Sequence, residues 1–163
     1  MSIDDIIVRG PGKISMGNAA SALEGVTRFD VVAFCAEEFQ PDRSLILRKN
    51  ARTRVIYAPN DDGDLTRRQL EIAANAADQV AGEFLQGKKV LVTCMAGKNR
   101  SGLVIALALH MLSGAGGIAA ARLVRAKRRS FGGPALTNPS FNALLENIPP
   151  RPQPAGGIAL SHV

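Results

Sequence analysis

The chain has 163 residues, of which 46% are hydrophobic and 21% charged, and these values are typical of one soluble globular domain. Aromatic residues make up only 4%, so the core must consist mainly of aliphatic side chains. The net charge of +6 and the sequence pI of about 9.9 favour anionic partners. Because no uncharged apolar run reaches membrane-spanning length and the acidic N-terminus lacks a signal-peptide pattern, we expect a cytoplasmic protein.

Short apolar runs alternate with longer amphipathic segments along the chain. The expected strands are residues 6–8, 13–16, 30–35, 54–57 and 89–93. The expected helices are residues 18–23, 66–86, 99 or 100 to 113, 117–129 and a last one that starts at 138–139. This alternation predicts an α/β fold with a central, mostly parallel sheet of four to five strands and helices on both faces.

Capping residues mark the ends of two expected helices. Thr66 and Gln69 form a capping box at the start of the helix at 66–86, and Asn138 is an N-cap followed by proline. From residue 149 the chain is rich in proline and glycine and can bury little apolar surface. We therefore expect one domain over residues 1–148 and a flexible tail over residues 149–163.

Residues 94–101 read Cys-Met-Ala-Gly-Lys-Asn-Arg-Ser and lie between an expected strand and an expected helix. A loop in this position aims backbone N–H groups at one point, where the positive end of the helix dipole also acts. Arg100 can hold two phosphate oxygens at once, and the same positive field would stabilise a thiolate at Cys94. Such a thiolate could form a phosphocysteine. The expected phosphate-binding residues are Met95, Ala96, Gly97, Lys98, Asn99 and Arg100.

Two other kinds of site do not fit the sequence. A nucleotide P-loop would share Gly97-Lys98, but it also needs glycine at position 92 and serine or threonine at 99, where this chain has Val92 and Asn99. The two cysteines and two histidines lack the spacing of metal ligands. We therefore expect neither a metal nor a cofactor.

The order Cys94-x5-Arg100-Ser101 resembles the signature of the cysteine-dependent protein tyrosine phosphatase superfamily. Residues 11–18, 121–128 and 138–141 are similar to segments of the compact dual-specificity phosphatase domain, so the resemblance covers about residues 6–148. It implies hydrolysis of phosphotyrosine and, in the dual-specificity type, of phosphoserine or phosphothreonine. It also implies that the Ser101 hydroxyl helps the sulfur leave the intermediate.

The resemblance further implies a general acid on the loop before residue 66. Many members place this aspartate three residues after a proline, which selects Asp62 because Pro59 precedes it. Asp61 is the alternative and Asp64 a weaker one, and all three could instead be turn-forming residues only. Most members have histidine just before the nucleophile, where this chain has Thr93, whose hydroxyl would replace the histidine in part.

Several features leave the substrate open. A phosphorylated protein, or another anionic phosphate ester, is the expected partner. Residues 96–98 resemble the phosphoinositide-phosphatase branch, although Met95 stands where that branch has a further basic residue, and residues 99–101 resemble RNA 5′-triphosphatases. A phosphate-binding module without catalysis is a further alternative. The basic residues near 122–129 form either a solvated helix face or a contact for an anionic partner.

Cys35 ends the expected strand at 30–35. Some members of the superfamily place a second cysteine there, which forms a protective disulfide with the oxidised nucleophile. Cys35 is therefore a possible redox partner of Cys94, and the alternative is a small buried core residue.

Overall fold

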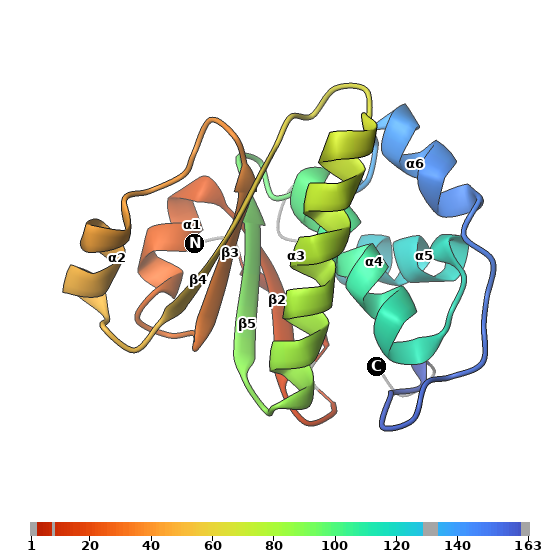
Figure 1. Ribbon diagram of the computed structural model, residues 1–163, viewed down its shortest axis with the longest axis horizontal. Helices are drawn as coiled ribbons and strands as arrows, with labels where there is room; N and C mark the ends of the chain where they lie inside the picture. The colour runs from red at the N-terminus through yellow and green to blue at the C-terminus, as the bar shows by residue number, and fades with distance from the viewer. Residues whose placement is uncertain (1–2, 8, 129–133, 161–163) are drawn as a thin grey trace.

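A five-stranded sheet forms the centre of the protein in the computed structural model, which describes residues 3–7, 9–128 and 134–160 (Figure 1). The strand order is β1-β2-β5-β3-β4; β1 is antiparallel to β2 and the other neighbours are parallel. The strands are β1 (Ile3–Ile7), β2 (Lys13–Asn18), β3 (Val31–Ala36), β4 (Arg54–Asn60) and β5 (Lys89–Cys94). The mostly parallel α/β fold expected from the sequence is confirmed.

Helices cover both faces of this sheet and create two cores. Side chains alternate along each strand, so Phe34 and Leu91 pack with the helices of one face, whereas Cys35 and Cys94 belong to the core of the other. The first face carries α1 (Ala19–Gly25) and α2 (Arg43–Lys49). The second carries α3 (Arg67–Leu85), α4 (Arg100–Ser113), α5 (Gly117–Lys127) and α6 (Pro139–Glu146).

The predicted capping residues act as expected. The Thr66 side chain accepts a hydrogen bond from the Gln69 amide, and the Gln69 side chain accepts one from Thr66 in return. Asn138 caps α6 by accepting from the amides of Ser140 and Phe141. Asn18 also caps, so α1 begins one residue later than predicted.

The main error of the sequence prediction is α2, which was not expected. This helix has only seven residues and buries one large apolar side chain, Ile46, so it shows no helical repeat that a pattern could reveal. Strand β1 begins three residues earlier than predicted, at Ile3, because it pairs with β2 from there. Val8 and Arg129, at the ends of a predicted strand and a predicted helix, lie outside the described residues.

The described part of the tail, residues 149–160, lies beside α4. The amide of Arg151 donates to the Gly114 carbonyl at 2.7 Å, and that of Ile158 donates to the Leu112 carbonyl at 2.9 Å. These bonds satisfy carbonyls that the end of α4 leaves without helical partners. The flexibility expected of this segment stays a prediction. None of the helices in the described ranges has both the length and the apolar character needed to cross a membrane.

Candidate functional site

The signature loop, residues 94–100, connects β5 to α4 at the carboxyl end of the parallel strands, where ligands of open α/β sheets usually bind. Cys94 is 4% exposed, whereas the next two residues, Met95 and Ala96, are exposed. The Cys94 sulfur lies 3.2 Å from the Ser101 hydroxyl oxygen. The sulfur thus sits at the inner end of the loop, beside a hydrogen-bonding hydroxyl, as the sequence predicts.

Three carbonyl groups of the signature loop are held by its surroundings. The Met95 carbonyl accepts a hydrogen bond from the Ala19 amide, and the Lys98 carbonyl accepts one from the Leu136 amide. The Gly97 carbonyl accepts one from the Arg128 guanidinium. In a trans peptide the carbonyl and the following N–H point in opposite directions. The next amides along the chain therefore point away from these outer partners and toward the inside of the loop, the orientation that a phosphate-binding nest requires.

Gly97 makes this loop conformation possible. Its φ of +64° lies in the left-handed region, and a Cβ atom there would lie 2.7 Å from the Gly17 carbonyl oxygen and 2.5 Å from an Arg128 nitrogen. Both observations exclude a larger residue without rearrangement.

Arg100 is buried, and the terminal nitrogens of its guanidinium are hydrogen-bonded. Its two terminal nitrogens donate to the two carboxylate oxygens of Glu38 at 2.5 and 2.6 Å, and Nη1 also donates to the Asn60 carbonyl. Its Nε, in contrast, is buried and has no acceptor among the described residues. A buried donor without an acceptor is costly, so the arrangement suits an anion that supplies one.

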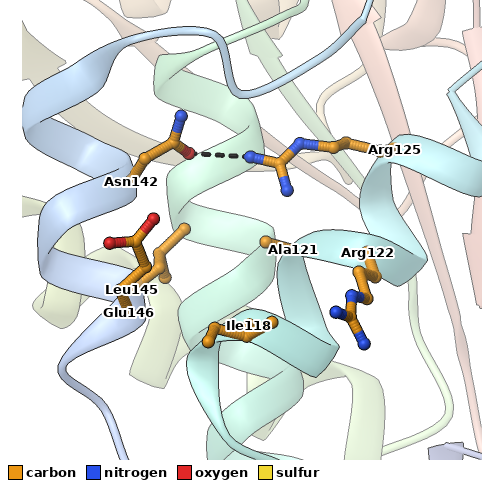
Figure 2. A pocket seen from close by; sticks show the side chains of 7 residues that line it. All are labelled: Ile118, Ala121, Arg122, Arg125, Asn142, Leu145 and Glu146. Atoms are coloured by element: carbon orange, nitrogen blue, oxygen red, sulfur yellow. Dashed lines mark hydrogen bonds between the residues drawn. The ribbon is translucent and has the colours of Figure 1, made fainter.

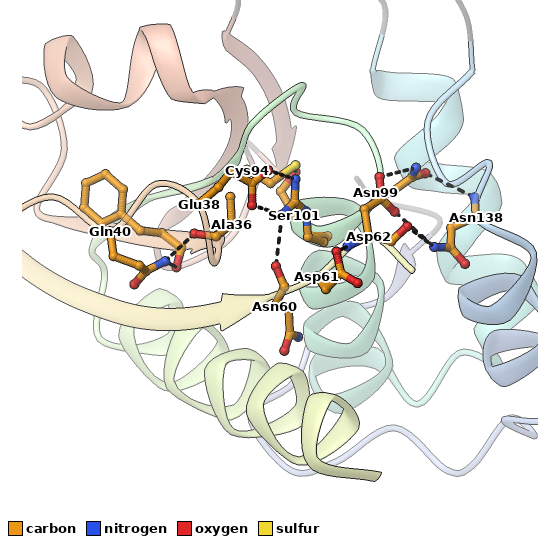
Figure 3. Close-up of polar contacts among 12 residues, drawn as sticks. Ala36, Glu38, Gln40, Asn60, Asp61, Asp62, Cys94, Asn99, Ser101 and Asn138 are labelled. Atoms are coloured by element: carbon orange, nitrogen blue, oxygen red, sulfur yellow. Dashed lines mark hydrogen bonds and ion pairs between the residues drawn. The ribbon is translucent and has the colours of Figure 1, made fainter. Parts of the chain in front are cut away.

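Charges around Arg100 keep its guanidinium ionised. Burial opposes the charged form, but the hydrogen bonds to Glu38 and the charges of Cys94, Glu38 and Asp62 raise the pKa of Arg100 above its ordinary value. The same bonds lower the pKa of Glu38. Gln40 shapes the loop that carries Glu38 by donating to the carbonyls of Phe34 and Ala36 (Figure 3).

Asp62 is clamped between two amide side chains (Figure 3). Asn99 of the signature loop donates to one carboxylate oxygen at 3.0 Å, and Asn138 donates to the other at 3.0 Å. Asn138 also donates to the carbonyls of Asp62 and Gly63, and the Asn99 oxygen accepts from the amides of Thr137 and Asn138. Asp62 is therefore tied directly to the signature loop.

Asp61 is placed differently. Its carboxylate accepts from the amide of the next residue, Asp62, at 2.8 Å, a bond within its own loop. Both aspartates are exposed, but among the described residues only Asp62 accepts a side-chain hydrogen bond from the signature loop.

The Thr93 hydroxyl does not contact the nucleophile loop in the way expected of a replacement for the usual histidine. It donates to the Ala33 carbonyl on β3 at 2.9 Å and so fastens β5 to β3, instead of holding the nucleophile or its loop. The hydroxyl therefore does not make the expected bond to the nucleophile or its loop, because neighbouring residues of a strand face opposite sides of the sheet.

Cys35 lies beside Cys94. Phe34 and Thr93 are partners in the parallel β3–β5 register, so the next residues of the two strands are neighbours that face the same core. Burial, with the charge of Cys94, raises the pKa of Cys35 well above its ordinary value. No disulfide joins these two cysteines in the described structure.

No other part of the described surface combines a cysteine, a buried arginine and an aspartate in this way. A hollow of about 370 Å³ between α5 and α6 contains two arginines, but Arg125 already donates to Asn142 (Figure 2). Arg125 also donates to the carbonyls of Ala135 and Leu136. In the described ranges no group of three or more His, Cys, Asp or Glu side chains could hold a metal ion.

Sequence reasoning missed four residues that shape the site. Asn138 was recognised only as a helix cap, and Glu38, Gln40 and Arg128 were not assigned to the site. The position of Glu38, two residues beyond a buried strand of a parallel sheet, was the one usable signal, because the carboxyl ends of such strands converge.

No family model and no curated protein sequence matches the chain. Solved structures do match. Tk-PTP in its active form is 22% identical over 88% of this chain and 94% of its own, with a TM-score of 0.67. Human DUSP28 is 19% identical over 90% and 91%, with a TM-score of 0.70. These likenesses show the dual-specificity phosphatase fold.

One further match limits what the fold implies. The human tyrosine phosphatase-like serine/threonine/tyrosine-interacting protein is 19% identical, covers 88% of this chain and 93% of its own, and has a TM-score of 0.65. The name of that protein is phosphatase-like rather than phosphatase. The fold alone is therefore compatible with catalysis and with binding without catalysis. The distinction between the two depends on the side chains of the site.

Proposed function

We propose that the chain is a cysteine-dependent phosphatase that hydrolyses phosphate monoesters on proteins through a phosphocysteine intermediate. The observation that carries the proposal is that Arg100, whose buried Nε has no acceptor among the described residues, lies near enough to Cys94 for their charges to interact. The fold, the inward-pointing loop amides and the Ser101 hydroxyl beside the sulfur support it. A pure binding module would not need a nucleophile and a candidate acid around the same anion site.

The reaction has two steps. The Cys94 thiolate attacks phosphorus while Asp62 gives its proton to the leaving oxygen, so the alcohol departs and a phosphocysteine remains. Water then attacks phosphorus, Asp62 takes its proton, and the sulfur leaves as a thiolate with a hydrogen bond from Ser101. Arg100 and the loop amides hold the phosphoryl oxygens through both steps.

Hydrolysis of p-nitrophenyl phosphate tests the proposal. The native protein should release nitrophenol, Cys94→Ser should have no detectable turnover, and acid quench with mass spectrometry should find phosphate on Cys94. Thermal unfolding of Cys94→Ser is the control, since the variant should remain folded. A Cys94→Ser protein as active as the native one, or a native protein without turnover on any phosphate monoester, would overturn the proposal.

The acid is tested separately. Asp62→Asn should lower kcat on a poor leaving group, such as phenyl phosphate, by roughly 10²–10⁴. Asp61→Asn is the matched control because it changes the neighbouring exposed carboxylate. If Asp61→Asn shows the larger loss, the assignment passes to Asp61.

We also propose that Cys35 protects Cys94 from irreversible oxidation: peroxide oxidises the Cys94 sulfur to a sulfenic acid, and the Cys35 sulfur then attacks it to form a disulfide with release of water. The neighbouring positions on β3 and β5 support this role. Mild peroxide should give a Cys35–Cys94 crosslink by mass mapping, and Cys35→Ala should lose activity irreversibly under the same treatment. If no crosslink forms, Cys35 is a core residue only.

A further inference from the structure

A second surface with binding features lies at the outer edge of the sheet. Strand β4 is the last strand in the order, and a hollow of about 260 Å³ lies between it and α2. We call this the α2–β4 hollow, and it is lined by Arg43, Leu47, Thr53, Arg54, Val55 and Tyr57. Ligand pockets for small molecules usually measure about 300–1,000 Å³, so this volume suits a side chain better than a cofactor.

The hollow contains an anchored aromatic ring. Tyr57 is 42% exposed, yet its hydroxyl donates to the Pro41 carbonyl at 2.8 Å and its ring stacks on Phe34 with centroids 6.2 Å apart. Leu47, also 42% exposed, lies on the α2 wall. Tyrosine and arginine are enriched in protein-binding hot spots, and a tyrosine that is already fixed loses little side-chain entropy on binding.

Basic side chains lie in and near the hollow. Arg43 and Arg54 line it, and Arg52 directly precedes the lining residue Thr53, whereas the N-cap of α2, Asp42, is acidic. Residues 43–54 contain five basic side chains and no acidic one. Arg54 pairs with Glu83, whereas the other four make no ion pair with any residue that the structure describes: Arg43, Arg48, Lys49 and Arg52. These four side chains are exposed. Their charge favours a partner that brings carboxylates to the edges of the hollow.

The hollow also lies in line with the candidate site. Tyr57 precedes Asn60 by three residues on β4, and the Asn60 carbonyl accepts from Arg100. At a strand rise of about 3.3 Å per residue the two positions are roughly 10 Å apart. An extended polypeptide could therefore occupy both places, with about three to six residues between them.

We propose that the α2–β4 hollow docks an acidic segment of a phosphorylated protein substrate, with one apolar side chain in the hollow and flanking carboxylates on Arg43 and Arg52. This inference deepens the proposed function and rests on it. Tyr57 and Leu47 line a hollow, which disfavours a membrane surface. One face of Tyr57 already stacks on Phe34, which disfavours nucleic-acid bases.

Four peptides test the proposal. Each carries one phosphotyrosine and, four residues away, either Glu-Glu-Leu-Glu-Glu or Gln-Gln-Leu-Gln-Gln. Each of these two segments is placed before the phosphotyrosine in one peptide and after it in another. The native protein should show a KM about tenfold lower for the glutamate peptide in one of the two directions. At about 1 M salt, where the screening length is ~3 Å, this preference should disappear.

The double variant Arg43→Glu/Arg52→Glu should lose the preference and keep its kcat on p-nitrophenyl phosphate. Leu47→Ser should weaken binding of both peptides alike. The matched control is Lys88→Glu/Arg122→Glu, which reverses two exposed charges elsewhere and should keep the preference. A preference that survives in the first double variant, or that is lost equally in the control, would overturn the proposal.

Binding to the Cys94→Ser protein separates this inference from the proposed function. Fluorescence anisotropy with the labelled glutamate peptide measures docking without turnover, so a protein inactive on p-nitrophenyl phosphate could still show docking. If Arg43→Glu/Arg52→Glu instead loses retention on phosphatidylserine vesicles or single-stranded RNA, with peptide affinity unchanged, the surface serves another ligand and the docking proposal is wrong.

Discussion

A single amide side chain connects three parts of the candidate site. Asn99 donates to Asp62 and accepts from the amides of Thr137 and Asn138, at 2.7 and 3.2 Å for the latter two. An amide carries both a donor and an acceptor at the same distance from the backbone, so the shorter side chain of serine could not make both contacts. Asn99 therefore positions the candidate acid relative to the nucleophile loop.

Removing this amide should affect the acid more than the nucleophile. We expect Asn99→Ala to lower kcat on phenyl phosphate by about 10–100-fold and to change kcat on p-nitrophenyl phosphate much less, because a good leaving group needs little protonation. Steady-state kinetics on the two esters measure the difference. Equal losses on both esters would show that Asn99 supports the loop as a whole.

Glu38 gives the Arg100 contact a pH dependence. The hydrogen bonds from Arg100 lower the pKa of Glu38 in the folded protein, so the contact stabilises the fold above the unfolded pKa of about 4.3 and is lost as pH falls through the folded value. Glu38→Gln should therefore lower the Tm at neutral pH, and the difference from the native protein should shrink near pH 3. Thermal unfolding at both pH values measures it, and a constant difference would contradict this account.

At the scale of elements, the end of α5 is fastened to the signature loop and to β1. Arg128, the C-cap residue of α5, donates to the Gly97 carbonyl at 2.8 Å, to Asp4 at 2.7 Å and to the Met16 carbonyl at 3.0 Å. It is only 3% exposed. The sequence interpretation of this stretch as a basic surface is therefore wrong for Arg128, which turns inward where the helix ends.

Breaking this contact should destabilise the fold. Arg128→Met keeps much of the volume but leaves the Asp4 carboxylate and the Gly97 carbonyl without these donors, so we expect a loss of about 3–5 kcal/mol in the free energy of unfolding. Urea denaturation measures it. Arg122→Met, on the exposed side of α5, should cost less than about 0.5 kcal/mol, and similar losses in the two variants would argue against a specific role for Arg128.

At the scale of the whole molecule, the C-terminal segment contacts the end of the main core. Ile158 and Leu160 pack against it, and two backbone bonds connect the segment to α4. We expect truncation after residue 148 to lower the free energy of unfolding by about 1–3 kcal/mol through lost apolar burial, and to leave kcat on p-nitrophenyl phosphate unchanged. An unchanged unfolding free energy would instead support the flexible tail predicted from composition.

The sequence alone predicted the features that depend on neighbours along the chain. The order of strands and helices, the caps at Thr66 and Asn138, and the loop from Cys94 to Arg100 all follow from residues a few positions apart. Capping bonds and helical repeats involve such residues, so their patterns can be recognised in the sequence alone. For the same reason α2, which has too few turns to form a repeat, was missed.

Only the tertiary structure decided which side chains complete the site. The bond between Glu38 and Arg100 spans 62 positions, that between Asn138 and Asp62 spans 76, and that between Arg128 and Asp4 spans 124. Nothing in the local sequence of either partner specifies such a contact, because the strand order of the sheet brings the segments together. The eight consecutive residues 94–101 determine the chemistry of the loop. The contacts that hold Arg100, Asp62 and the Gly97 carbonyl in place depend on how the whole chain packs.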